Sequence, residues 1–575
     1  MTKLIRFLKP FKISVAVVLL LVFAQTFSEL YLPTLMADIV DTGIVNGNIP
    51  YIINTGGFML LIAAAGTLCS IGASFLASKT AAGLGRLLRS KVFSRVEDFS
   101  LQEFNQMGTA TLITRTTNDI NQIQTVTFMI LRMMVSAPIM CLGGIFMAVS
   151  MDRPLSLLLL IAVPLIVLLV TFIMRHAIPL FKLMQIKLDR LNLVLRENLT
   201  GIRVIRAFNR ISRERERFTA ANRDLTDNAI RVNKLMAAMM PGMMLVMNFT
   251  IIAIIWFGSI RIDGGGMQVG SLMAFIQYAT MILLSLVMMS MMFIMLPRAA
   301  ASAVRINEIL DIIPGIKDPD RVKQPDSDKG CLEFKDVSFS FPGAEQPALS
   351  NISFTARPGE TTAIIGGTGS GKTTLINLIP RFYDVSQGAV LIDGVDVREM
   401  SQESLRSKIG LVPQTAVLFS GSITENIRFG QEDASPDEVY AAAQTAQALE
   451  FITGMKNGFD SFIEQGGTNV SGGQKQRLSI ARAIVRRPDI YIFDDSFSAL
   501  DFKTDARLRA ALKEETREST VLIIAQRVST IMEADQIIVL EDGQIVGKGS
   551  HEELLESCEV YREIVYLQLS EEELA

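Results

Sequence analysis

The hydrophobic residues gather into long uninterrupted runs in the first 310 residues and into short runs after that point. The long runs lie near residues 13–36, 54–78, 127–150, 154–174, 240–262 and 271–296. Each approaches or exceeds the roughly 20 residues that a helix needs to cross about 30 Å of hydrocarbon. The pattern therefore predicts an all-α domain with six membrane-spanning helices over residues 1–310.

The polar connections between these runs alternate in length and charge. The long segments 79–126 and 175–238 carry 6 and 14 Lys and Arg residues, and residues 1–12 carry 4. In the short connections 37–53, 151–153 and 263–270, Arg153 is the single Lys or Arg. Because Lys and Arg are retained on the cytoplasmic side, we expect the long segments and both ends of the domain in the cytoplasm. This predicts a multi-pass protein of the cell inner or plasma membrane.

The two long cytoplasmic segments contain few Gly or Pro residues and retain helical periodicity, as over 191–208, so we expect helical extensions of the spans. Glu29 and Arg132 are ionisable residues inside the spans. A charge in the membrane must face a cavity or a partner, which makes both candidate functional residues. The alternatives are a helix–helix hydrogen bond for Glu29 and snorkelling of Arg132 to the inner interface.

The formal net charge of −3 is a cancellation between two unlike parts of the chain. Residues 1–310 hold 29 Lys and Arg against 16 Asp and Glu, a net charge of +13, and residues 311–575 hold 26 against 42, a net charge of −16. Four widely spaced cysteines and two histidines argue against a disulfide framework, a zinc site or a His-based triad. A polar, Pro-containing linker is predicted over 311–329.

A second domain is predicted over 330–575, where a strand-like run leads into a turn of the GxxxxGK[ST] pattern at 366–373. Glycines let backbone N–H groups converge on phosphate oxygens, so the pattern predicts an α/β P-loop domain that binds ATP with Mg²⁺. Lys372 is expected to reach the β- and γ-phosphates, and the hydroxyl of Thr373 to ligate Mg²⁺. The expected phosphate-binding residues are Gly366, Gly367, Thr368, Gly369, Ser370, Gly371, Lys372, Thr373 and Thr374.

Two further motifs belong to the same chemistry. A buried-strand pattern at 490–493 ends in Asp494 and Asp495, where a Mg²⁺-holding aspartate is expected at Asp494. The sequence VSGGQ at 470–474 opens a helix and again favours anion binding. These two phosphate-binding helix starts lie about 100 residues apart in the chain, so both can serve one nucleotide only if two copies of the domain sandwich it.

Over essentially its whole length the chain resembles an ABC transporter half, a six-helix exporter domain fused to an ATP-binding domain. The resemblance implies that Phe341 stacks on adenine, that Gln414 lies near Mg²⁺ and the attacking water, and that Asp501 belongs to the D-loop at 498–501. It also implies coupling helices around 106–116 and 202–209. By the same resemblance, ATP held by a second chain would be contacted by Ser471, Gly472, Gly473 and Gln474.

The chain departs from the family pattern at both catalytic positions. Asp495 stands where the family has its catalytic glutamate, and Gln526 stands where it has the switch histidine. A side chain one methylene shorter misplaces the base, and a misplacement of about 1 Å can lower a rate about 100-fold. We therefore expect the chain's own Walker site, formed by the glycine-rich turn at 366–373 and Asp494, to bind ATP and hydrolyse it slowly. In the alternative, Asp495 and Gln526 are tolerated variants of a working site. The pattern resembles the degenerate-site subunit of heterodimeric bacterial multidrug exporters.

The expected function is ATP-driven export of hydrophobic or amphipathic compounds, drugs or lipids, across the bilayer. The expected partner is a second half-transporter chain that carries the catalytic Glu and the switch His, and no nucleic-acid partner is expected. Three alternatives stay open: a homodimeric exporter with working Asp495 sites, an importer of the same fold, and an ATP-sensing regulatory subunit.

Overall fold

The structure, a computed structural model, describes residues 6–325 and 330–568. The last four residues of the predicted linker, 326–329, therefore lie outside the described residues, as do the outermost ends of the two predicted domains. The chain forms two compact units. One contains the described residues up to Glu97 together with Gly108–Ile312, and the other contains Asp98–Met107 together with the described residues from Ile313 onward.

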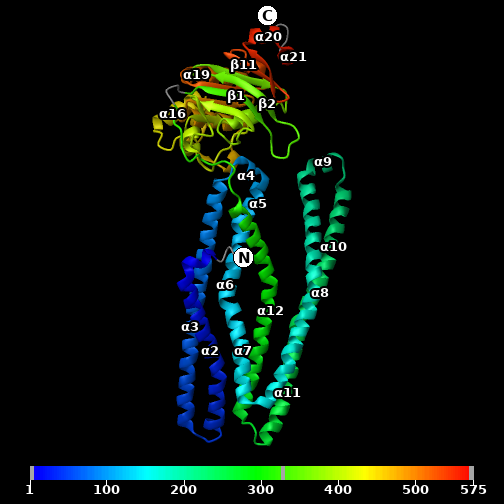
Figure 1. Cartoon of the computed structure of the whole chain (residues 1–575). Coiled ribbons are helices and arrows are strands. Elements are labelled where there is room, and N and C mark those ends of the chain that lie inside the picture. Colours follow the sequence, from blue (N-terminus) through cyan, green and yellow to red (C-terminus); the bar gives the residue numbers. More distant parts are fainter. Residues whose placement is uncertain (1–5, 326–329, 569–575) are drawn as a thin grey trace. The chain divides into compact units, whose positions relative to one another are not determined.

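The first unit is entirely helical, and its helices confirm the six predicted spans (Figure 1). The helices long and apolar enough to cross a membrane occupy Arg6–Ile44, Ile49–Glu97, Thr109–Met151, Arg153–Thr200, Ile211–Asp263 and Val269–Asp311. Their components are η1 (Arg6–Phe11), α2 (Lys12–Asp38), η2 (Ile39–Ile44), α3 (Ile49–Glu97), α5 (Thr109–Thr114), η3 (Arg115–Asp119), α6 (Ile120–Met129), η4 (Ile130–Met134), α7 (Val135–Met151), α8 (Arg153–Thr200), α10 (Ile211–Ala237), α11 (Met239–Asp263) and α12 (Val269–Asp311).

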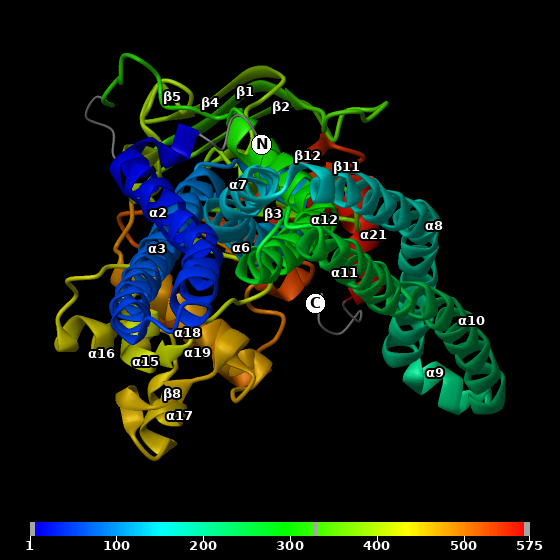
Figure 2. The same ribbon diagram turned by 90° about the horizontal axis from the view of Figure 1, so that it is seen from below.

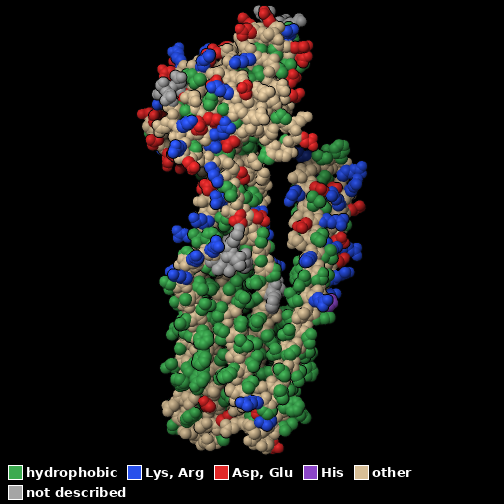
Figure 3. All heavy atoms as spheres, viewed as in Figure 1, with side chains coloured by type: hydrophobic (Ala, Val, Ile, Leu, Met, Phe, Trp, Pro, Cys, Tyr) green, Lys and Arg blue, Asp and Glu red, His purple; other side chains and the backbone are tan. Residues whose placement is uncertain are grey.

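The long basic segments are helical extensions of the spans, as their periodicity predicted. Helices α8 and α10 run side by side and are joined at one end by the short helix α9 (Ile202–Ala207), which Figures 1 and 2 both show. The amide of Asn228 on α10 donates a hydrogen bond of 3.1 Å to the carbonyl of Leu180 on α8. On the face shown in Figure 3, basic side chains cover this end of the pair, whereas hydrophobic side chains cover the membrane-spanning portion.

The first predicted coupling segment, 106–116, is divided between separate helices. A separate helix, α4, covers Leu101–Met107 and groups with the second unit, where the carboxylate of Glu103 accepts from the backbone N–H of Gly315 over 3.4 Å. Gly108, with φ +72°, ends this helix. Most of the predicted segment 106–116 belongs to α5 and η3 of the third span, because the positive φ of Gly108 separates α4 from α5. The prediction did not recognise Gly108 as a helix boundary.

The two intramembrane ionisable side chains both have partners. Arg132 lies in the π-helical turn η4 and donates from Nη1 to the carbonyl of Ser70 at 2.8 Å and to the hydroxyl of Ser74 at 2.5 Å, both on α3. Glu29 accepts from Gln25, one turn earlier in its own helix, over 2.9 Å. Arg132 is thus bonded to a neighbouring helix, and Glu29 is bonded within α2.

The second unit is the predicted α/β domain. Its main sheet has the order β12–β11–β3–β10–β9–β6, and all neighbours in it are parallel except the β11–β12 pair. The strands are β3 (Thr361–Gly366), β6 (Ile409–Val412), β9 (Ile490–Asp494), β10 (Thr520–Ile524), β11 (Gln536–Glu541) and β12 (Gln544–Gly549). Because helices cover a parallel sheet on both faces, its central strands read as continuous apolar runs, and all of β9 is buried.

A second, antiparallel sheet has the order β2–β1–β4–β5, formed by β1 (Leu332–Phe339), β2 (Leu349–Ala356), β4 (Gln387–Ile392) and β5 (Val395–Asp396). A small pair, β7 (Gly421–Ser422) with β8 (Phe462–Ile463), lies apart from both. The helices are α13 (Lys372–Leu378), α14 (Gln402–Ser407), α15 (Ile423–Arg428), α16 (Pro436–Thr445), α17 (Leu449–Gly454), α18 (Gly472–Val485), α19 (Phe502–Glu515), α20 (His551–Ser557) and α21 (Glu559–Gln568). Serine capping boxes start α15, α16, α18 and α20.

Candidate functional site

The predicted catalytic and phosphate-binding segments follow the carboxyl ends of four parallel strands. Gly366 ends β3, Asp494 ends β9, and Gln526 and Gln414 lie two residues beyond β10 and β6. Ile524 of β10 pairs in register with Asp494 on one side and with Ile364 of β3 on the other. Since the carboxyl ends of parallel strands meet at one edge of the sheet, the fold gathers these residues at a single site.

The glycine-rich turn has backbone geometry that only glycine accommodates. Gly371 has φ +98°, and a Cβ there would lie 2.8 Å from Leu349 Cδ2. A Cβ on Gly366 would lie 2.1 Å from the carbonyl oxygen of Leu540. The turn therefore passes closely between neighbouring strands and leads directly into α13, whose first turn carries Thr373 and Thr374.

The side chain of Lys372 folds back over this turn. Its Nζ donates to the carbonyls of Gly366 and Gly367 at 2.8 and 2.7 Å. Burial lowers the pKa of Lys372, and the negative charges of Asp494 and Asp495 oppose that shift. An ammonium group held by the backbone carbonyls of a glycine-rich turn fits the terminal phosphates of a nucleotide.

Asp494 is buried, with 6% of its surface exposed, at the end of β9. Burial, reinforced by the nearby charge of Asp495, raises the pKa of Asp494 to about 6, although Lys372 opposes the shift. A carboxylate that is costly to ionise in this way fits a divalent cation. In the described residues no group of three His, Cys, Asp or Glu side chains is placed to hold a metal alone. The arrangement thus fits Mg²⁺ held jointly by protein and phosphate oxygens.

Asp495 adopts a left-handed backbone conformation, with φ +45°. Its N–H donates to the carbonyl of Ile524 over 2.9 Å, and its own carbonyl accepts from the hydroxyl of Ser498, also over 2.9 Å. Its side chain accepts from the amide of Gln414, with 3.4 Å between Gln414 Nε2 and Asp495 Oδ2. The structure therefore brings together two of the three predicted catalytic residues.

A cavity of about 470 Å³ contains the third, Gln526. The glycine-rich turn, Gln414 and Gln526 line it together with three residues of the C-terminal helix α21: Ile564, Leu567 and Gln568. Sequence reasoning missed this helix. Its alternation of buried Tyr561 and Val565 with polar residues signals an amphipathic helix, but no motif connects it to the phosphate site.

The VSGGQ motif forms the start of α18. The hydroxyl of Ser471 accepts from the N–H of Gln474 over 3.3 Å, while the amide oxygen of Gln474 accepts from the N–H of Ser471 over 2.9 Å. A Cβ on Gly473 would lie 3.1 Å from the carbonyl of Ala499, so the motif lies against the 498–501 segment. Ser471 and Gly472 are exposed and are not part of the lining of the 470 Å³ cavity.

Two other predicted residues have clear local roles. Phe341 follows β1, is 40% exposed, and packs edge-on against Tyr383, with 5.6 Å between the ring centroids. Asp501 caps α19, and the hydrogen bond that its carboxylate accepts from the N–H of Thr504 lowers the pKa of Asp501. Phe341 is thus a partly exposed ring at the end of an aromatic cluster, whereas the carboxylate of Asp501 is engaged by its own helix.

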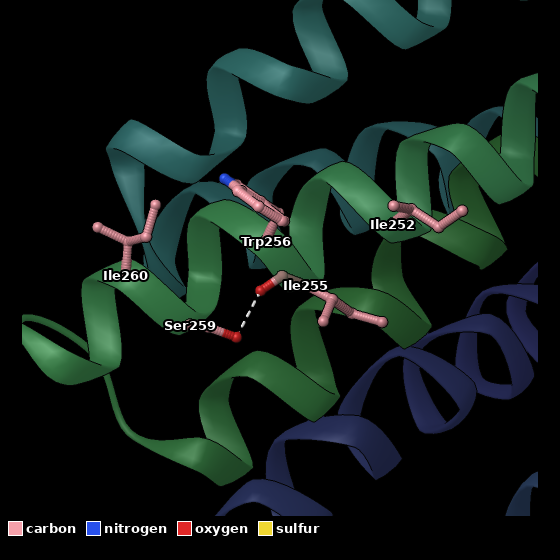
Figure 4. Close-up of a pocket in the computed structure, with 5 residues that line it drawn as sticks. All are labelled: Ile252, Ile255, Trp256, Ser259 and Ile260. Atoms are coloured by element: carbon pink, nitrogen blue, oxygen red, sulfur yellow. Dashed lines mark hydrogen bonds between the residues drawn. The ribbon is translucent and has the colours of Figure 1, made fainter.

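An apolar groove of about 410 Å³ lies on α11 in the first unit (Figure 4). It is lined by Ile252, Ile255, Trp256, Ser259 and Ile260, and the hydroxyl of Ser259 donates to the carbonyl of Ile255 over 2.7 Å. The lining has two polar side-chain groups: the hydroxyl of Ser259, which is bonded to the backbone, and the indole N–H of Trp256. The groove suits hydrocarbon and offers no catalytic group.

Two family models match the chain. The model of the ABC transporter transmembrane region matches residues 15–300, and the model described as ABC transporter matches residues 349–498. The first match lies mainly in the helical unit and the second lies in the α/β unit. The fused order of the two regions is that of a half-transporter.

Relatives and a solved structure agree with this assignment. An uncharacterised ABC transporter ATP-binding protein of Mycobacterium tuberculosis is 45% identical, over 98% of this chain and 97% of its own length. An ATP-dependent lipid A-core flippase of Syntrophus aciditrophicus is 34% identical, over 85% of this chain and 81% of its own. A bacterial Atm1-family ABC exporter, solved with ATP bound, superposes with a TM-score of 0.80 at 26% identity, covering 98% of this chain and 99% of that one.

Proposed function

Because the chain belongs to the ABC transporter family, as a half-transporter of the exporter type, we propose that it is the degenerate-site half of a heterodimeric exporter. In this family an ATP-binding domain drives export across a bilayer, and two such halves act together. In the proposed heterodimer the two ATP sites differ in their rate of hydrolysis. This chain's own Walker site would bind ATP and hydrolyse it slowly, while its VSGGQ motif completes the partner's active site.

The phosphate site has the parts needed to bind MgATP. Lys372 would contact the β- and γ-phosphates, and the hydroxyl of Thr373 with the carboxylate of Asp494 would hold Mg²⁺, with Gln414 beside it. When bound, Mg²⁺ neutralises phosphate charge and orients the terminal phosphate. Phe341, with its exposed ring, would stack on the adenine base.

The observation that carries the proposal is the state of Asp495. Its carboxylate is one methylene shorter than a glutamate, and its Oδ2 already accepts from Gln414. A general base must lie about 2.6–3.2 Å from the water that it activates. Gln526 is a neutral side chain, so it can hydrogen-bond a γ-phosphate but cannot supply positive charge. Binding is therefore retained while both catalytic contributions are weakened.

The VSGGQ motif supports the complementary half of the proposal. Its capping box fixes the first turn of α18, and its first two residues are exposed. An exposed helix start with free backbone N–H groups can receive the phosphates of ATP bound by another chain. The partner would then supply the Walker motifs, the catalytic Glu and the switch His of the competent site.

For the substrate we propose hydrophobic or amphipathic molecules, drugs or lipids. A relative named as a lipid A-core flippase shares 34% identity with the chain, which supports an amphipathic substrate. ATP would favour one membrane-domain state over the other by binding it more tightly, and its hydrolysis at the partner's site would reset the cycle.

Inverted membrane vesicles that contain this chain and its partner test the proposal. Export predicts ATP-dependent accumulation of a lipophilic dye inside the vesicles, and the Lys372→Ala variant tests the contribution of this chain's ATP site. ATP-dependent loss of preloaded dye would instead indicate an importer. The absence of any ATP-dependent flux of lipophilic dyes and labelled lipids would favour a regulatory subunit.

A further inference from the structure

We infer that Gln568, at the end of the C-terminal helix α21, is a positioning residue for the switch segment 526–528. By fixing this segment, Gln568 would direct the side chain of Gln526 toward the γ-phosphate of ATP. The inference rests on the proposed function, in which ATP occupies this chain's own Walker site. Helix α21 lies outside all of the nucleotide-binding motifs.

One side chain holds the switch segment at two points. Nε2 of Gln568 donates to the backbone carbonyl of Gln526 over 2.8 Å, and Oε1 of Gln568 accepts from the backbone N–H of Val528 over 2.8 Å. A carboxamide has one donor end and one acceptor end, so only one orientation satisfies both contacts. Gln568 thus fixes the backbone immediately on either side of Arg527.

Helix α21 is itself firmly anchored to the domain. Its Tyr561 and Val565 are fully buried in an apolar cluster that also contains Ala525 and Val528. The hydroxyl of Tyr561 lies 2.7 Å from Nδ1 of His551 on α20. The helix therefore packs against Ala525 and Val528, on either side of Gln526 and Arg527, and this packing holds the helix that carries Gln568.

Two residues of the switch segment are exposed. Gln526 and Arg527 are exposed, in contrast to the buried Ala525 and Val528 beside them. Gln526 shares the cavity lining with Lys372 and with Gln568 itself. Without Gln568, the carbonyl of Gln526 and the N–H of Val528 would lose these partners, and the Gln526 side chain would be free to leave the phosphate position.

The opposite side of the segment connects to the aspartate pair. Nη2 of Arg527 donates to the carbonyl of Ser498 over 3.1 Å, and the hydroxyl of Ser498 donates to the carbonyl of Asp495 over 2.9 Å. The switch segment is therefore held between α21 on one side and the loop after β9 on the other. Its position links the C-terminal helix to the catalytic loop through a continuous set of hydrogen bonds.

The test measures whether this chain's site distinguishes ATP from ADP, because a γ-phosphate contact affects only ATP. Full-length chain and partner, with the partner's catalytic Glu replaced by Gln, are photolabelled with azido-ATP or azido-ADP and Mg²⁺, and labelling of this chain alone is quantified. Gln568→Ala should weaken azido-ATP binding about tenfold, as expected for lost hydrogen bonds to a charged group, and azido-ADP binding less than about twofold. Gln568→Glu keeps the acceptor for Val528 and should fall between.

Glu563→Ala is the matched control, since Glu563 is an exposed residue of the same helix, and it should leave both affinities unchanged. Equal losses for the two nucleotides, or no loss in either Gln568 variant, would overturn the positioning role. If Gln568→Ala fails to fold, the Gln568→Glu variant decides by the same comparison. If the Lys372→Ala variant is labelled by azido-ATP as strongly as the wild type, ATP does not bind at the proposed Walker site. That result would refute the proposed function and the inference with it.

Discussion

The side-chain amide of Gln414 donates to the carboxylate of Asp495, with 3.4 Å between Nε2 and Oδ2. In this arrangement the carboxylate at the catalytic position is turned toward a neighbouring side chain of its own site. A glutamate at this position would carry its carboxylate one methylene further from the backbone, and a difference of about 1 Å in the position of a base can change a rate about 100-fold. Substitutions at Asp495 can therefore test why hydrolysis at this site is proposed to be slow.

Restoring the family's catalytic pair should create a hydrolytic site. With the partner's catalytic Glu replaced by Gln, the double variant Asp495→Glu, Gln526→His should raise the ATP turnover of the complex about 10- to 100-fold, because the base and the positive charge are both regained. Steady-state phosphate release measures this. Asp495→Asn with Gln526→His is the control and should show no increase, and an equal increase in both would point away from the base.

Removing the charge of Lys372 should strongly weaken ATP binding at this chain's site. Two charge-assisted contacts to phosphates account for a loss of affinity of about 100-fold. Equilibrium binding of a fluorescent ATP analogue to Lys372→Ala is the measurement. Lys456, exposed in the same domain, provides the matched control Lys456→Ala, which should bind as the wild type does. Retained binding in Lys372→Ala would show that the glycine-rich turn is not the nucleotide site.

Magnesium-dependent binding should weaken in mild acid. The pKa of Asp494 is raised to about 6, mainly by burial, so a proton competes with Mg²⁺ for this carboxylate below that pH. Mg²⁺ affinity should change little between pH 8 and 7 and should approach a tenfold loss per pH unit below about pH 6, as one competing proton requires. Asp494→Asn should bind Mg²⁺ weakly and without this pH dependence. A wild-type profile that is flat down to about pH 5 would contradict the assignment.

The buried carboxylate of Asp152 should stabilise the membrane domain mainly as a helix cap. It accepts from the N–H of Leu155 over 2.8 Å and from Nη2 of Arg261 over 2.8 Å, and only 3% of its side chain is exposed. Asp152→Asn retains a capping oxygen, whereas Asp152→Ala removes the cap and should cost about 1 kcal/mol more. Thermal unfolding in detergent compares them, with the exposed Asp263→Ala as control. Equal losses in the two Asp152 variants would assign the effect to the ion pair.

Much of the fold could be predicted because its signals are strong and local. Six apolar runs predicted the membrane-spanning helices, and the GxxxxGK[ST] turn after a strand predicted the turn between β3 and α13 that lines the 470 Å³ cavity. The boundary at Gly108 was missed because a single residue with positive φ separates α4 from α5. A periodic pattern alone does not distinguish a long helix from two shorter ones.

The contribution of α21 could not be predicted, because it depends on a contact between residues 40 positions apart with no shared motif. The partners of Arg132 have the same character, since Ser70 and Ser74 are ordinary polar residues of a span until the packing of α3 brings them to the arginine. Long-range pairs of this kind arise from tertiary packing, which sequence spacing does not encode.

The most direct test of the account is the ATPase activity of the purified chain, alone and together with a second half-transporter chain that carries Glu and His at the two catalytic positions. The account predicts little activity alone and strong activity in the pair, which falls only modestly with Asp495→Asn in this chain and nearly vanishes when the partner's catalytic Glu is replaced by Gln. Strong activity of the chain alone that Asp495→Asn abolishes would contradict it and would identify a homodimer with working Asp495 sites.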